Sequence, residues 1–155
     1  ETRDIMQYLA TFEHTFGVLQ NGQALERVAE EAVEDLADDG VVYAEIRFAP
    51  ELHQQKGMTL EEAVEAVCSG LKKGEERAFS KGQKIRVNLI CCAIRMAQRS
   101  MEIVQLVDVM RQSFDRVVGF DIAGAESEWP PSLHAEAFQY ARERLINITI
   151  QLVVF

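Results

Sequence analysis

The sequence predicts an α/β fold in which parallel strands are joined by helical crossovers. Apolar runs of strand length alternate with amphipathic segments of helical period, and each connection between strands is long enough to contain a helix. The run 85–94 is almost continuously apolar, which is typical of a strand buried on both faces of a parallel sheet. These patterns leave two closures open, a doubly wound sheet and a (β/α)8 barrel.

Four strands are predicted, each neighbouring the next in chain order, because long crossovers require parallel pairing. No internal repeat, low-complexity tract or linker divides the 155 residues, so residues 1–155 are expected to form one unit. The predicted strands are 41–49, 85–94, 117–123 and 146–154.

Helical segments carry clear start and stop signals. Gly40 suits the left-handed position that follows a helix, so the second helix should end there. Thr59 and Glu62 have the spacing of a capping box, which predicts the start of a long helix. The predicted helical ranges are 4–19, 25–40, 59–79, 100–114 and 132–144.

Composition and charge narrow the function classes. With 48% hydrophobic and 26% charged residues, the chain is expected to fold around a sizeable core. A formal net charge of −9 disfavours nucleic acid and anionic membranes as partners, and favours small neutral or cationic ligands. The absence of an apolar leader or spanning stretch, with three cysteines in no framework spacing, predicts a cytoplasmic protein whose cysteines are buried.

Four segments resemble the adenosine deaminase family. Residues 43–50, Tyr-Ala-Glu-Ile-Arg-Phe-Ala-Pro, are similar to a recurrent strand of that family, Tyr-Ala-Glu-Val-Arg-Phe-Ser-Pro. Residues 87–95 resemble the strand that runs through a Cys-Cys pair into a Met-Arg turn, with Ile94 at the methionine. Residues 119–126 resemble Gly-Phe-Asp-Leu-Ala-Gly-Asp-Glu, and residues 134–149 resemble the helix and strand before a His-Ala-Gly-Glu motif.

This resemblance favours the barrel and implies a zinc-dependent hydrolase that deaminates adenosine, or a related purine nucleoside, to inosine. A typical barrel needs about 250 residues, so the chain should hold about half of a (β/α)8 barrel. Family matching implies that Gly124 contacts the purine through its N–H and that Ile94 lines the base pocket. It also implies that helix 4–19 gates the mouth like a lid, through Ile5, Tyr8, Leu9 and Phe12.

The family's catalytic groups do not match residues of this chain. Its His-X-His zinc ligands would precede Glu1, and Gln151 and Val154 occupy the histidine and glutamate positions of the His-Ala-Gly-Glu motif. We therefore expect no catalytic residue, no metal ligand, no bound zinc and no activity in this chain alone. The three histidines lack paired ligand spacing and are expected on helix surfaces or loops: His14, His53 and His134.

Three charged residues are predicted to face the barrel interior. Glu45 and Arg47 share one face of their strand, and burying such a pair is costly unless each charge finds a partner. Asp121 lies on the matching face of the third strand, so Arg47 and Asp121 should come within ion-pairing reach of each other or of Glu45. The simpler interpretation makes these residues a structural charge network rather than catalytic groups.

Alternative interpretations remain open at this point. The chain could be a noncatalytic module that binds a nucleoside or a partner protein through the same mouth, or an unrelated doubly wound sheet. The edges at 41–49 and 146–154 are expected either to continue into the other half of a barrel or to drive self-association. In the simpler interpretation Gly124 serves a tight turn, and without the resemblance the aromatic stripe of helix 4–19 would be core. The acidic residues 30–39 are expected to form a solvated helix face.

Overall fold

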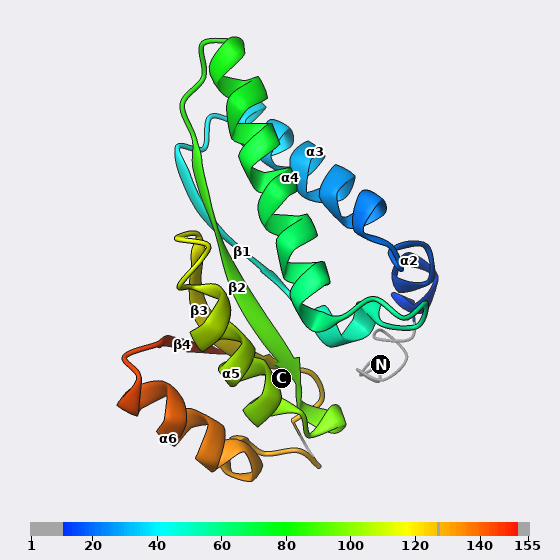
Figure 1. Cartoon of the computed structure of the whole chain (residues 1–155), viewed down its shortest axis with the longest axis vertical. Coiled ribbons are helices and arrows are strands. Elements are labelled where there is room, and N and C mark those ends of the chain that lie inside the picture. Colours follow the sequence, from blue (N-terminus) through cyan, green and yellow to red (C-terminus); the bar gives the residue numbers. More distant parts are fainter. Residues whose placement is uncertain (1–10, 127, 152–155) are drawn as a thin grey trace, which may run out of the picture.

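A computed structural model describes residues 11–126 and 128–151 and places four parallel strands in the order β1-β2-β3-β4 (Figure 1). The parallel pairing and the chain-order neighbours are as predicted. A crossover with a helix joins each strand to the next. The strands are β1 (Tyr43–Phe48), β2 (Arg86–Ile94), β3 (Val117–Ala123) and β4 (Asn147–Ile150).

The helices largely follow the predicted ranges, with two shortened ends. The predicted helix 132–144 begins instead as a 3-10 turn, and the predicted helix 100–114 ends at Met110. Of the predicted helix 4–19, residues 1–10 lie outside the described residues. The α-helices are α2 (Glu13–Val18), α3 (Gly22–Asp38), α4 (Leu60–Ser80), α5 (Ser100–Met110) and α6 (Ala135–Glu143), and the 3-10 turns are η1 (Pro50–His53), η2 (Arg95–Ala97) and η3 (Pro131–His134).

The helices pack against one face of the sheet. Alternate side chains of β2 and β3, such as Leu89 and Phe120, share one core with buried side chains of α3, α4, α5 and α6. The opposite face carries a small separate cluster of Ala49, Cys92 and Ala123. A doubly wound sheet would need helices on both faces and a reversal of strand order, so this alternative is wrong.

Burial differs between the central and outer strands. The interior of β2 is buried throughout, in agreement with its apolar sequence. β1 instead alternates exposed and half-buried residues, and Tyr43 keeps 54% of its surface exposed. The face of β1 that carries the charged residues therefore meets solvent in the described part of the chain.

The predicted helix signals are present. Thr59 and Glu62 form the capping box, since each side chain bonds the other residue's backbone N–H, at 3.1 and 2.8 Å. Gly40 has a φ of +84°, the left-handed conformation expected after α3. Among the described residues, no helix combines the length and apolar character that crossing a membrane requires.

α3 and α4 run side by side and approach closely at two glycines. A Cβ at Gly70 would clash with the carbonyl oxygen of Glu26, and one at Gly74 would lie 2.6 Å from Cβ of Val33. The helices can touch at this distance only because neither glycine has a side chain. The contact fixes α3 against the sheet through α4.

Only part of the acidic stretch of α3 is the solvated face that its composition predicts. Glu30 is buried and its Oε1 lies 2.6 Å from Nε of Arg77, while Glu34 lies 3.1 Å from Nη1 of Arg77 and 3.5 Å from Nζ of Lys81. The helical period turns these two carboxylates toward α4, whose basic residues meet them. Residues Glu31, Asp35, Asp38 and Asp39 are exposed as expected.

We predict that Gly70→Ala and Gly74→Ala each lower the free energy of unfolding by about 2 kcal/mol or more, because overpacking a tight contact forces the backbones apart. Urea unfolding of the purified chain measures this loss. Gly17→Ala is the matched control, since nothing lies within 4 Å of a Cβ there. A loss at Gly17 equal to that at Gly70 would contradict the packing argument.

Candidate functional site

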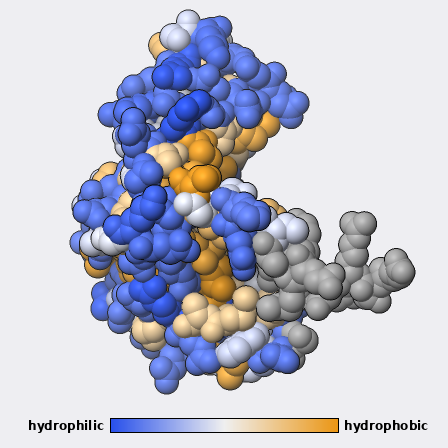
Figure 2. Space-filling view, turned by 90° about the vertical axis from the view of Figure 1, so that its right-hand side faces the viewer, coloured by the Kyte–Doolittle hydropathy of each residue, from blue (hydrophilic) through white to orange (hydrophobic). Residues whose placement is uncertain are grey.

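The candidate site is a groove of about 500 Å³ at the carboxyl ends of the strands. Its lining joins the interior face of the sheet to an apolar wall formed by α2, α3 and η1. Figure 2 shows hydrophobic side chains gathered along a hollow between two more hydrophilic parts of the surface. Barrel enzymes place their active sites at this end of the strands. The lining of the groove includes Phe12, Phe16, Arg47, Ile94 and Gln151.

An ion pair crosses the interior face of the sheet above β2. Nη1 of Arg47 on β1 donates to Oδ2 of Asp121 on β3 at 2.6 Å, as the shared facing of the two strands predicts. The side chain of Asp121 is fully buried, whereas that of Arg47 is 39% exposed. The pair therefore gives a buried carboxylate its counter-charge at the edge of the groove.

Glu45 and Cys92 lie beside this pair. Neither is arranged as a reactive group. Oε1 of Glu45 accepts from the hydroxyl of Tyr43 at 2.5 Å, and this hydroxyl accepts from Nδ2 of Asn88, so Glu45 belongs to a second polar chain lower on the sheet. Burial, with the carboxylate of Asp121, raises the pKa of the Cys92 thiol, which keeps it protonated and unreactive.

Arg95 ties together the loops that follow β2, β3 and β4. Its fully buried side chain donates from Nη2 to Oε1 of Glu126 at 3.0 Å and to the carbonyl oxygen of Gln151 at 2.8 Å. Nη1 donates to the carbonyl oxygen of Trp129 at 3.1 Å. The backbone at Gln151, where the family motif would begin, is thus held by a guanidinium group from η2, directly after β2.

Gly124 stands directly after β3 with a φ of +118°. A Cβ there would lie 3.1 Å from Sδ of Met96, so both conformation and space favour glycine. The structure brings Ile94 and Phe12 into the groove, while Gly124 lies beside the loop of Met96 and outside the groove lining. Of the other residues expected at the substrate, Ile5, Tyr8 and Leu9 lie outside the described residues.

Glu51 supports the groove in a way that its sequence does not signal. Its Oε1 accepts from the backbone N–H of Ile94 at 2.6 Å, so η1 holds the end of β2. Oε2 is buried without a hydrogen-bond partner among the described residues, and burial raises the pKa of this carboxyl group. A buried carboxylate in this position fixes the backbone next to the expected base pocket.

Two histidines are buried rather than at the surface, which corrects the expectation for them. His53 is 4% exposed, with Nδ1 2.7 Å from the carbonyl oxygen of Leu19, and burial lowers its pKa. His134 is 2% exposed, with Nδ1 2.9 Å from Oγ of Ser100; burial, aided by the charge of Arg95, lowers its pKa. Both lie in 3-10 turns that pack under neighbouring elements, which periodicity does not indicate.

The described residues do not fit a zinc ion. No three histidine, cysteine, aspartate or glutamate side chains in residues 11–126 and 128–151 gather as metal ligands. The groove offers the cation Arg47, the protonated thiol of Cys92 and the amide of Gln151, which are poor zinc ligands in these states. It also offers one histidine, His53, whose Nδ1 is already bonded to the carbonyl oxygen of Leu19.

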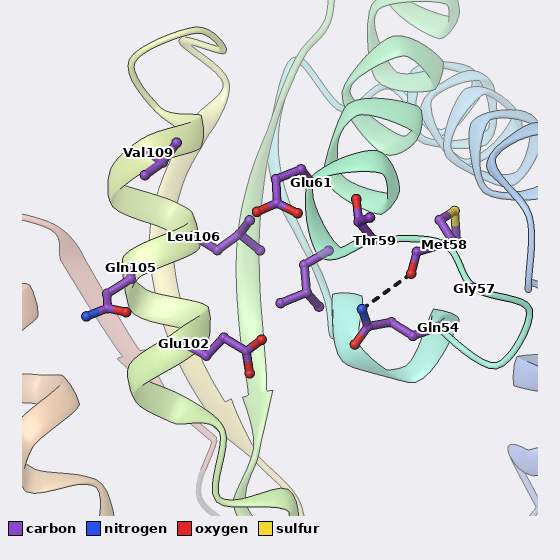
Figure 3. Close-up of a pocket in the computed structure, with 10 residues that line it drawn as sticks. Gln54, Gly57, Met58, Thr59, Glu61, Glu102, Gln105, Leu106 and Val109 are labelled. Carbon is purple, nitrogen blue, oxygen red and sulfur yellow. Dashed lines mark hydrogen bonds between the residues drawn. The ribbon is translucent and has the colours of Figure 1, made fainter.

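A second hollow of about 580 Å³ lies on the helical side, between the start of α4 and α5 (Figure 3). Nε2 of Gln54 donates across its rim to the carbonyl oxygen of Met58 at 3.3 Å. Glu102 is held by Arg99, whose Nε lies 2.6 Å from Oε2. This hollow lies on the opposite side of the sheet from Arg47 and Asp121, so the groove is the stronger candidate site.

The comparison with protein families decides the membership of the chain. The model of the family named adenosine deaminase matches residues 1–151. The chain belongs to the adenosine deaminase family. This result confirms the resemblance carried by the strand segments, and with the one-sided helical layer it makes the sheet about half of a (β/α)8 barrel.

Curated relatives share about half of their aligned residues with the chain. Adenosine deaminase 1 of Streptomyces coelicolor is 51% identical over 150 residues, which are 97% of this chain and 37% of that protein. An adenosine deaminase of Mycobacteroides abscessus is 50% identical over 151 residues, or 41% of its length. The chain thus spans about two fifths of the relatives it matches.

Solved structures of related proteins have the same fold. Arabidopsis ADAL, crystallised with IMP, superposes with a TM-score of 0.83 at 29% identity, over 96% of this chain and 44% of that one. Adenine deaminase of Arthrobacter aurescens gives 0.80 at 25% identity, over 95% of this chain and 43% of that one. An amidohydrolase from Burkhoderia ambifaria, solved with bound zinc, gives 0.72 at 27% identity, over 85% and 35%.

We predict that Arg47→Met lowers the free energy of unfolding by about 3 kcal/mol, because it leaves the carboxylate of Asp121 buried without a counter-charge. Asp121→Asn should lower the free energy of unfolding by less, because the partly exposed guanidinium group of Arg47 that it releases can be hydrated by water. Urea unfolding of both variants and of the double variant measures the difference. Equal losses, or strict additivity in the double variant, would show that the two side chains do not depend on each other.

We predict that acidification from about pH 7 to about pH 5 destabilises the chain partly through His134. Its pKa in the folded chain lies below the ordinary value of 6.5, so the unfolded chain takes up more protons as the pH falls through that value. The stabilisation is present above this range and is lost as the pH falls. His134→Asn should flatten the dependence of unfolding free energy on pH, and an unchanged slope would contradict this assignment.

Proposed function

We propose that the protein to which this chain contributes hydrolyses the amino group of adenosine, or of a related purine nucleoside, to give the inosine product. The observation that carries this proposal is the groove at the strand ends, formed in a chain of the adenosine deaminase family. Its apolar wall suits the faces of a purine and a ribose, and Arg47 in its lining is already paired with the carboxylate of Asp121.

Each residue proposed to contact the substrate has a distinct physical role. Ile94 and Phe12 line the groove and would cover the apolar faces of the base, together with Ile5, Tyr8 and Leu9 from the same end of the chain. Gly124 would offer its N–H to the purine ring from the end of β3, where it lies beside Met96 and next to the groove lining rather than in it. Glu45, Arg47 and Asp121 would act as structural charges, not as proton-transfer groups.

Zinc is proposed as the cofactor of the whole protein and not of this chain alone. When bound, zinc would supply a water of lowered pKa for attack on the purine. No set of described residues fits the ion, so its ligands would come from elsewhere in the whole protein. The contribution of this chain would be to bind and orient the nucleoside and to exclude water from it. The buried, unpaired cysteines agree with a cytoplasmic location, which we also propose.

An alternative function is a noncatalytic module that binds a nucleoside or a partner protein through the same groove. Two observations favour it: the amide of Gln151 at the position of the family's histidine, and the lack of a ligand set among the described residues. Self-association through the edges of β1 and β4, which pair on one side only in the described sheet, would accompany this alternative.

A chimera tests the proposed function. Residues 1–150 would replace the matched part of the Streptomyces coelicolor relative, whose own residues would resume after Ile150. We predict that the chimera binds zinc and deaminates adenosine, as an absorbance assay would show. A folded, zinc-loaded chimera without turnover would overturn the proposal, and the unmodified relative is the control.

A second chimera tests the role of the last residues. If it also keeps residues 151–155 of this chain, in place of the corresponding residues of the relative, we predict a loss of turnover of about 10²-fold or more, because the proton-donating glutamate and a zinc ligand disappear. The isolated chain should likewise hold no stoichiometric zinc and convert no adenosine. Full turnover in the second chimera would show that the deaminase does not need the motif.

A further inference from the structure

α2 forms one wall of the groove, but the helix has few features of its own that would stabilise its position. The helix has six residues, none of them buried, and no side chain caps its start. Helices of this length are unstable in isolation, so the position of α2 must come from contacts with the rest of the chain. Phe12 and Phe16, which line the groove, depend on that position.

Gln20 provides the first contact, from the turn between α2 and α3. Its side chain is 2% exposed, and Nε2 donates to the carbonyl oxygens of Phe16 at 2.7 Å and Leu52 at 2.8 Å. Oε1 accepts from the backbone N–H of Gln55 at 2.9 Å. One amide group thus joins the last turn of α2 to η1 and the residues after it.

His53 provides the second contact from η1 itself. Its Nδ1 donates to the carbonyl oxygen of Leu19, which directly follows α2. The imidazole ring stacks on Phe48 of β1 at 5.8 Å between centroids, and Phe16 meets it edge-on at 6.1 Å. The ring therefore connects the barrel strand to the helix that covers the groove.

We propose that Gln20 and His53 form a two-point latch that fixes α2 over the groove and thereby sets the affinity for the nucleoside. The effect on nucleoside affinity rests on the proposed function. Both contacts bind backbone carbonyls at the end of α2 and both are anchored in or beside η1, which follows β1 directly. Gln20 is a positioning residue, since its bond reaches the groove through Phe16. His53 holds the end of α2 and its ring also lies in the groove lining, so the Gln20 variant tests positioning alone.

Amide hydrogen exchange of the purified chain tests the latch directly. Gln20→Leu removes the three hydrogen bonds, and His53→Phe keeps a stacked ring without the donor. In both variants we expect the amides of α2 to exchange about tenfold faster, with those of β2 unchanged within about twofold. His53→Asn restores a nitrogen donor near the position of Nδ1 and should lie closer to the original chain than His53→Phe.

Matched controls lie next to the latch. Gln23→Leu changes an exposed glutamine of α3, and His14→Phe changes an exposed histidine of α2, so neither should alter exchange by more than about twofold. Unchanged exchange of α2 in both latch variants would overturn the proposal. A parallel rise in α2 and β2 would also overturn it, because the loss would then be global rather than local.

Adenosine titration of the same variants tests the link to binding. We expect the Kd to rise about tenfold for Gln20→Leu and His53→Phe and to stay unchanged for the two controls. A freed α2 with an unchanged Kd would refute the effect on affinity. If the original chain binds no adenosine, the proposed function of the groove fails, whereas the exchange result still decides whether the latch holds α2.

Discussion

The ion pair between Arg47 and Asp121 is the constraint on which the interior face of the sheet depends. It spans from β1 to β3 across β2, and it supplies the counter-charge of a carboxylate that has no exposed surface. A charge buried in this way is tolerated only with a partner at short range, so the two strands must keep their facing and register. Because β1 carries Arg47 and leads straight into η1, the pair also fixes the base from which the groove is built.

The two faces of the sheet differ in their packing, and this difference explains the location of the site. The helical face is closed by one continuous core, and the hollow between α4 and α5 lies on its outer side. The interior face carries few apolar contacts in the described chain, and its carboxyl end is organised by polar groups. Arg95 joins three loops, and Glu51 and Gln20 hold backbone groups of other elements. The apolar wall is then added by α2.

Local sequence signals predict the features that are set by residues close together in the sequence. The parallel strands, the capping box at Thr59 and the turn at Gly40 follow from spacing and residue type. Even the distant pair of Arg47 and Asp121 was predictable, since both charges interrupt apolar strands on matching faces. The resemblance to a known family chose between barrel and open sheet, which periodicity alone left undecided.

Other features depend on contacts that no local pattern encodes. Gln20 and Leu52 are 32 positions apart, and an isolated glutamine in a turn gives no sign that it will be buried. The same holds for His53 and His134, which a spacing rule for metal ligands assigns to the surface. The acidic residues of α3 were misjudged because composition does not show which of them the helical period turns toward Arg77. The place of Gly124 outside the groove lining likewise follows from the path of the loop after β3.

The central claim is that the nucleoside occupies the groove at the strand ends. Labelling of the purified chain with a photoreactive azido analogue of adenosine, followed by peptide mapping, tests this claim most directly. We predict labels in the segments of α2, η1 and the end of β2, and protection of those segments by excess adenosine. Specific labelling confined to the outer hollow near Glu61 and Glu102, with none in the groove, would contradict it.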